Sequence, residues 1–181
     1  MKKYIQTFDN VIPKDLCDQL IQKFEVSKDQ QKSTDLAGHR HFTEININTY
    51  GDWDNWVTGL IDYLKPYVNK YKMLTEITHN QWPQQYGFEQ IRFKKYEAND
   101  RDEFKSHVDV GDYMSARRFL VFFLYLNENE GGETTFDEYN VTVKPEPGRL
   151  LMFPPMWTYL HSGLKPKVNP KYIIGSYLHY L

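Results

Sequence analysis

The chain has 181 residues, a formal net charge of −2 and a single cysteine, Cys17. This length fits one domain, the near-neutral charge excludes the basic face of a dedicated nucleic-acid binder, and one cysteine excludes an internal disulfide. No segment approaches the roughly 18 apolar residues of a membrane span, so we expect no membrane partner. The charge and the single cysteine lead us to expect a cytoplasmic protein without a nucleic-acid partner.

The first part of the chain predicts two amphipathic helices. Pro13 suits a first helical turn. Apolar side chains follow it at spacings of three and four residues, namely Leu16, Cys17, Leu20, Ile21 and Phe24. The same spacing recurs from Trp53 to Leu64, and we expect Pro66 to end or kink this second helix. Between the helices, residues 33–50 are expected to form a loop that leads into a strand.

From residue 88 onward, apolar residues alternate with a period of two, and turn residues separate the short runs. Eight strands are expected, at Ile91–Glu97, Phe104–Val110, Phe119–Asn127, Gly132–Phe136, Asn140–Lys144, Arg149–Pro154, Tyr159–Leu164 and Lys171–Tyr180. Short strands at this spacing are typical of a sandwich or a jelly roll. We therefore predict an α+β fold in a single domain over residues 1–181, in which helices from about 1–87 pack on one sheet of a jelly-roll core (a double-stranded β-helix) from about 88–181.

One pair of side chains in these strands could begin a metal site. His107 and Asp109 stand two residues apart in one expected strand, so their side chains should share a face. A third ligand must come from another strand, and His161 lies on a later one. Two histidines and one carboxylate on one side of a metal form the facial triad of non-haem iron oxygenases. A His-x-Asp pair is common by chance, so this interpretation depends on its surroundings.

Lys171 supplies part of those surroundings, because it begins the last expected strand. A dicarboxylate that chelates iron with one end needs a fixed cation for its other carboxylate, and a lysine ammonium provides one. Taken alone, Lys171 would be read as a solvated residue at the start of a strand.

Four blocks, in this order, resemble the prolyl 4-hydroxylase branch of the Fe(II)- and 2-oxoglutarate-dependent dioxygenases, including hypoxia-factor-type, viral and bacterial prolyl hydroxylases. They are Tyr96 with Phe104–Asp109, Arg118 with Tyr125–Asn127, Gly131–Phe136, and Gly148–Pro154 with His161–Gly163 and Lys171. The resemblance covers about residues 88–180, and Ser33–His39 also resembles the mobile loop over the active site of hypoxia-factor-type enzymes.

The resemblance implies a role for each matching residue. His107, Asp109 and His161 match the iron ligands, and Lys171 matches the residue that pairs with the distal carboxylate of 2-oxoglutarate. Tyr96, Tyr125 and Thr134 match positions that hydrogen-bond this co-substrate. Arg118, Trp157 and Tyr177 match residues at the mouth of the site that could touch the substrate. The implied enzyme uses Fe(II), 2-oxoglutarate and O2, with ascorbate as reductant. It hydroxylates a prolyl residue of a protein or peptide and releases succinate and CO2.

Three alternatives remain open at this point. The same chemistry could act on another amino-acid residue or on a small molecule. A non-catalytic jelly-roll module could use the two histidines and the carboxylate to bind structural zinc, although such a site has no use for Lys171. His39 and His41 also stand two residues apart, but no third ligand is visible near them.

Overall fold

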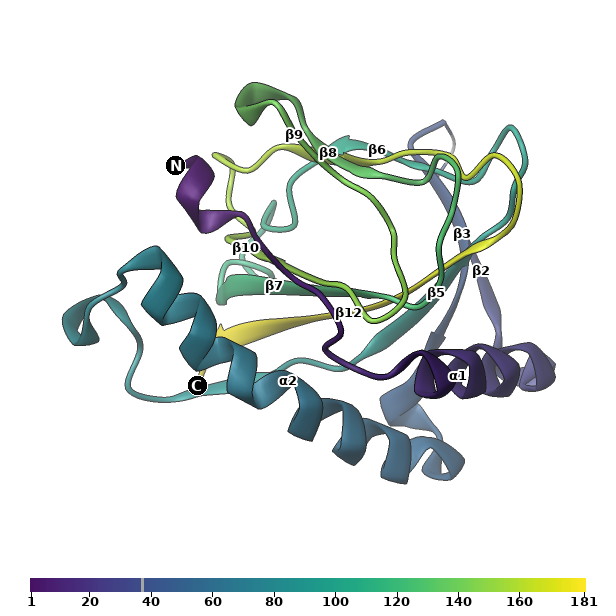
Figure 1. Cartoon of the computed structure of the whole chain (residues 1–181), viewed down its shortest axis with the longest axis horizontal. Coiled ribbons are helices and arrows are strands. Elements are labelled where there is room, and N and C mark those ends of the chain that lie inside the picture. Colours follow the sequence, from purple (N-terminus) through teal and green to yellow (C-terminus); the bar gives the residue numbers. More distant parts are fainter. Residues whose placement is uncertain (37) are drawn as a thin grey trace.

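The computed structural model describes residues 1–36 and 38–181. Twelve strands among these residues form one antiparallel sheet in the order β1-β10-β7-β12-β5-β3-β6-β11-β8-β9, with β2 beside β3 and β4 beside β12. The sheet curls into a jelly-roll-like barrel, and both long helices lie under one face of it (Figure 1). The predicted α+β jelly roll is therefore confirmed.

The described part of the chain contains two α-helices, α1 (Lys14–Val26) and α2 (Asp54–Thr75). The strands are β1 (Gln6–Phe8), β2 (Lys32–Leu36), β3 (Arg40–Asn46), β4 (Tyr86–Phe88), β5 (Arg92–Tyr96), β6 (Phe104–His107), β7 (Arg118–Tyr125), β8 (Thr134–Phe136), β9 (Val141–Val143), β10 (Leu150–Phe153), β11 (His161–Gly163) and β12 (Lys171–Tyr180). Short 3-10 helices lie at Lys2–Tyr4, Lys28–Gln30, Ile47–Thr49, Gly51–Trp53, His79–Gln81 and Asp137–Tyr139. No helix among these residues is long and apolar enough to cross a membrane.

Alternation along the central strands divides the interior into two cores. On β7, Leu120, Phe122 and Leu124 pack in the cluster that includes the helices, whereas Val121, Phe123 and Tyr125 pack in the barrel interior. Successive side chains of a strand point to opposite faces, so an uninterrupted apolar run fills both layers. The layer under the helices stabilises the fold, and the layer inside the barrel surrounds the site described below.

Pro66 was expected to end or kink the second helix, and it does not end it, because the helix continues to Thr75. Buried Leu60 and Leu64 before the proline are followed by buried Val68 and Tyr71 at the same helical spacing. Pro66 itself is exposed, so water can hydrogen-bond the carbonyl group whose partner the proline removes. Burial of one continuous stripe therefore outweighs the local break in hydrogen bonding.

The segment 33–50 also differs from its prediction, because most of it is a hairpin and not a loop. Strands β2 and β3 are paired from Lys32 opposite Glu44 to Leu36 opposite Arg40, and β3 continues the main sheet beside β5. Polar side chains on both strands hid the alternation that usually reveals a strand. The resemblance of Ser33–His39 to a mobile segment over the active site stays a prediction, and Ala37 lies outside the described residues.

Candidate metal and co-substrate site

Two of the three expected metal ligands are brought together by sheet register. His161 on β11 is the direct cross-strand partner of His107 on β6, so the two imidazoles project from the same face. Strand β6 ends at His107, and Asp109 lies in the segment beyond it. The prediction that Asp109 shares a face with His107 within one strand is therefore wrong. Its backbone N–H instead donates to the carbonyl oxygen of Pro155 at 3.1 Å, which carries the carboxylate between the histidines.

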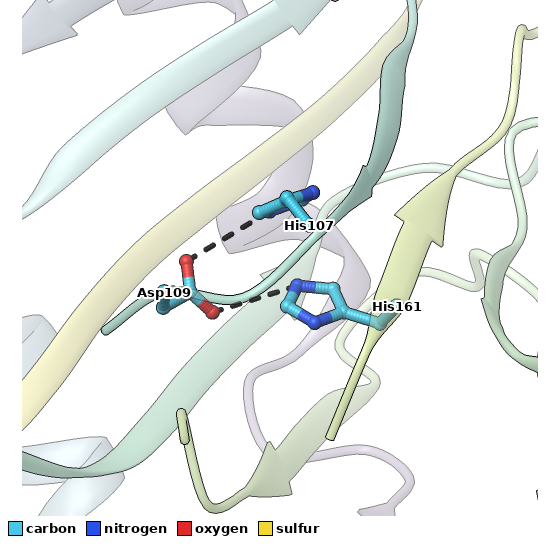
Figure 2. Close-up of side chains that lie close together, drawn as sticks. All are labelled: His107, Asp109 and His161. Carbon is cyan, nitrogen blue, oxygen red and sulfur yellow. Dashed lines mark ion pairs between the residues drawn. The ribbon is translucent and has the colours of Figure 1, made fainter. Parts of the chain in front are cut away.

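The three side chains converge as a metal site requires (Figure 2). The Nε2 atom of His107 lies 3.9 Å from Oδ1 of Asp109, and the Nε2 atom of His161 lies 3.5 Å from Oδ2. One ligand atom from each residue falls within 4.8 Å of the others. One small cation could therefore contact all three residues.

The protonation of the histidines also fits a metal. Nδ1 of His107 lies 2.7 Å from the carbonyl oxygen of Lys105, and Nδ1 of His161 lies 3.0 Å from that of Tyr159. A carbonyl oxygen can only accept, so each Nδ1 carries the hydrogen and each Nε2 offers a lone pair. Burial lowers the pKa of His107 to about 3, which keeps its imidazole neutral. Nε2 of His161 and Oδ2 of Asp109 are buried without a hydrogen-bond partner among the described residues, as expected of atoms that await a cation.

A second layer of contacts orients Asp109. The hydroxyl of Tyr177 donates to Oδ1 of Asp109 at 2.7 Å, and Nη1 of Arg118 donates to its backbone oxygen at 3.1 Å. The Arg118 guanidinium lies 4.0 Å from the centre of the Tyr177 ring and pairs with Glu89 at 2.9 Å. Asp109 is therefore held through its carboxylate by Tyr177 of β12 and through its backbone oxygen by Arg118 of β7.

Lys171 lies in the same cavity as the triad. This cavity is lined by Lys94, Tyr96, Phe104, His107, Asp109, Phe123, Thr134, His161, Gly163, Lys171, Ile173 and Gly175. The Lys171 side chain is only 2% exposed, its ammonium donates to the carbonyl oxygen of Gly132 at 2.9 Å, and it lies 4.4 Å from the centre of the Tyr96 ring. Burial lowers the pKa of Lys171 to about 7, although the nearby Glu133 carboxylate opposes the shift. A buried ammonium without a carboxylate ion pair among the described residues is suited to an anionic ligand.

The Gly131-Gly132 pair explains why this lysine can be buried so closely. Both glycines have positive φ, +77° and +72°, a conformation that other residues rarely adopt. A Cβ atom at Gly132 would lie 3.1 Å from Cδ of Lys171, and one at Gly131 would lie 2.6 Å from the backbone oxygen of Lys165. The turn before β8 therefore needs glycine both for its backbone and for the room that Lys171 occupies.

Comparison with known families identifies this arrangement. Residues 91–179 match the family model described as the 2OG-Fe(II) oxygenase superfamily. These residues, which carry the triad and Lys171, form a 2OG-Fe(II) oxygenase domain. As a 2OG-Fe(II) oxygenase the protein is a 2-oxoglutarate-dependent dioxygenase that uses Fe(II), 2-oxoglutarate and O2. No curated protein sequence matches the chain significantly.

Solved structures similar to this 2OG-Fe(II) oxygenase support the same fold. A viral collagen prolyl hydroxylase from Paramecium bursaria Chlorella virus-1, in complex with 2OG, is 19% identical with a TM-score of 0.68 over 98% of this chain and 96% of that chain. A prolyl hydroxylase from Trichoplax adhaerens, in complex with a hypoxia inducible factor peptide, is 18% identical with a TM-score of 0.73 over 98% and 84%. A Pseudomonas putida prolyl-4-hydroxylase is 15% identical with a TM-score of 0.69 over 98% and 93%. At these identities the likeness establishes the fold.

The remaining expected site residues of the oxygenase fall at different distances from the cavity. Tyr96 and Thr134 line it, whereas Tyr125 is buried behind it and its hydroxyl lies 2.6 Å from the Thr134 hydroxyl. Arg118 and Tyr177 line a neighbouring cleft of about 470 Å³. Trp157 is 79% exposed and lines none of the described cavities near the triad.

Sequence reasoning missed two charged residues of this site. Lys94 lines the cavity, and its place two residues before Tyr96 on the same strand face was a readable signal. Glu89, which holds Arg118, had no such signal because it is distant in sequence. His41 pairs with buried Asp102 at 2.7 Å, so a structural partner, and not a second metal site, accounts for that histidine.

Proposed function

We propose that this dioxygenase hydroxylates a prolyl residue of a protein or peptide, with release of succinate and CO2 from 2-oxoglutarate and with ascorbate as reductant. The single observation that carries the dioxygenase chemistry is the buried Lys171 ammonium in one cavity with the His107, Asp109 and His161 triad. A structural zinc module would have no need of this ammonium. Support for a prolyl target comes from the names of the structural neighbours, which are prolyl hydroxylases.

We propose that His107, Asp109 and His161 hold the iron and that Lys171 pairs with the distal carboxylate of 2-oxoglutarate. When bound, the iron supplies the oxygen-activating chemistry, while the protein orients the reactants and limits access of water. The proposed co-substrate contacts also include Tyr96 on the cavity wall, where its ring lies against Lys171. Thr134 would contact the co-substrate directly, and Tyr125 would act through the hydrogen bond that joins their hydroxyls.

Substrate contacts are proposed for Arg118, Tyr177 and Trp157. The cleft that Arg118 and Tyr177 line lies directly beside Asp109, because both residues hydrogen-bond that residue. Since the Tyr177 hydroxyl already donates to Asp109, a substrate would contact the ring of this residue. The exposed indole of Trp157 is free to stack on a peptide.

Mass spectrometry of a proline-containing peptide library tests this proposal. The enzyme is incubated with Fe(II), 2-oxoglutarate and ascorbate, and the peptides are searched for the mass gain of one oxygen on proline. Modification of prolyl residues, absent with Asp109→Ala, is the expected result. Succinate release with oxygen only on other residues would overturn the prolyl target alone. Absence of any succinate release, together with tight zinc binding, would favour the metal-binding module.

A further inference from the structure

Lys94 is a second lysine in the cavity that holds the triad and Lys171. Alternation along β5 separates it from its neighbours, because Phe93 packs under the helices and Lys95 pairs with Glu25 of α1, whereas Lys94 and Tyr96 face the barrel interior. A lysine side chain that points into a barrel gives up much of its hydration. Its position therefore needs an explanation that a surface lysine does not.

The protein offers the Lys94 ammonium no ionic partner among the described residues. The ammonium lies 4.9 Å from the centre of the Phe42 ring and has no hydrogen bond or ion pair with these residues. Glu44 is its cross-strand partner on β3, but no ion pair within 4.0 Å joins the two, and the Glu44 carboxylate accepts from the Thr34 hydroxyl at 3.2 Å. A salt bridge therefore does not explain why the Lys94 side chain lies in the cavity.

Sheet register places Lys94 between Lys171 and the metal ligands. Lys171 is paired across β12 and β5 with Tyr96, and Ile173 is paired with Lys94, so the two lysines differ by one two-residue step, roughly 6.6 Å of strand. Further along β12, Tyr177 contacts Asp109. Lys94, Lys171 and the three triad residues line one cavity, so the Lys94 side chain shares it with both ends of the site.

We propose that Lys94 is a second anion-binding residue of the co-substrate site and pairs with the carboxylate of 2-oxoglutarate nearest the metal, while Lys171 pairs with the distal one. A dianion with one carboxylate at each end of a short chain complements two ammonium groups separated along one cavity. The inference rests on the use of 2-oxoglutarate in the proposed function and does not depend on which residue is hydroxylated.

Calorimetric titration of the Zn(II)-loaded protein with two 2-oxo acids tests this assignment. Zinc accepts the same ligands and is redox-inert, so binding is measured without turnover. The probes are 2-oxoglutarate and 2-oxopentanoate, which has the same five carbons but lacks the distal carboxylate. The variants are Lys94→Met, Lys171→Met and Lys95→Met, the last removing an adjacent lysine from the opposite face of β5.

Lys94→Met should weaken binding of both probes by about ten-fold, because both keep the carboxylate that Lys94 would contact. Lys171→Met should weaken binding of 2-oxoglutarate by about ten-fold or more and leave the affinity for 2-oxopentanoate nearly unchanged. Lys94→Arg should retain most of the affinity, and Lys95→Met all of it. Circular dichroism confirms that each variant is folded.

Two results would overturn the inference. Either Lys94→Met binds both probes as the wild type does, or its loss is confined to 2-oxoglutarate, which would place Lys94 at the distal carboxylate. Failure of the wild type to bind 2-oxoglutarate would instead contradict the co-substrate assignment in the proposed function. The two failures are therefore distinguishable.

Discussion

Replacing Tyr177 with phenylalanine isolates a single hydrogen bond to a proposed metal ligand. The Tyr177 hydroxyl donates to Oδ1 of Asp109 at 2.7 Å, and no other side chain among the described residues hydrogen-bonds this carboxylate. The phenyl ring keeps its contact with Arg118, whose guanidinium lies 4.0 Å from the ring centre. Any effect of Tyr177→Phe can therefore be attributed to the hydroxyl.

The magnitude follows from the charge of the acceptor. A hydrogen bond to a charged group contributes about 1.5–3 kcal/mol, and loss of a contact that orients a metal ligand lowers metal affinity by about 10- to 100-fold. We expect Tyr177→Phe to weaken metal binding within this range and to destabilise the metal-free protein by about 1–2 kcal/mol, because Oδ1 of half-buried Asp109 loses its donor.

Competition with a chelating indicator measures the metal affinity, and urea denaturation measures the free energy of unfolding. Tyr180→Phe is the matched control, because Tyr180 lies on the same strand and is 51% exposed. The reasoning is refuted if Tyr177→Phe binds metal within two-fold of the wild type while Tyr180→Phe does the same. In that case the orientation of Asp109 would depend on its backbone contacts alone.

Three further predictions concern Lys171, Gly132 and Glu25. Burial lowers the pKa of Lys171 to about 7, so binding of the 2-oxoglutarate dianion should raise this pKa and be accompanied by proton uptake above pH 7. Calorimetry in buffers of different ionisation enthalpy should show less proton uptake for Lys171→Met than for the wild type. Equal proton uptake by the two proteins would contradict this prediction. Gly132→Ala should lower the free energy of unfolding by about 1–3 kcal/mol and weaken 2-oxoglutarate binding, because φ is +72° and Lys171 lies close; an unchanged melting temperature and affinity would count against it. Although burial opposes the shift, hydrogen bonds from Lys28, Lys95 and Tyr172 lower the pKa of Glu25 to about 2. Its stabilisation is therefore present above about pH 4.5 and lost as the pH falls towards 2, so Glu25→Gln should cost about 1 kcal/mol at pH 7 and the difference in denaturant midpoint should vanish in acid; a pH-independent difference would refute it.

The spacing of short apolar runs between turn residues predicted the jelly roll. Runs such as residues 119–125 are apolar throughout and end at turn residues, so their extent can be read directly. The hairpin β2–β3 escaped the same reading because nearly every side chain of β2 is polar and exposed or half-buried. The length of α2 escaped it because the local effect of Pro66 is visible in sequence, whereas the packing that overrides it is tertiary.

The expected metal ligands converge in the structure, but not for the reason first given. Alternation within one strand was expected to align His107 with Asp109, and the strand ends too early for that. Pairing of His107 with His161 across two strands could not be deduced from spacing, because register depends on the whole sheet. Lys94 was overlooked although it shares a strand face with Tyr96, because a lysine at that position does not by itself indicate a cavity.

The triad therefore combines two kinds of support, and they should respond differently to mutation. The histidines are positioned by pairing between β6 and β11, so a change that shifts this register would displace both together. Asp109 lies outside the sheet and depends on Pro155, Arg118 and Tyr177. A substitution at Arg118 or Tyr177 should consequently lower metal affinity while the histidine pair stays in place. Because these same two residues border the cleft beside Asp109, our proposal that substrate occupies this cleft predicts that substrate binding and metal affinity are coupled.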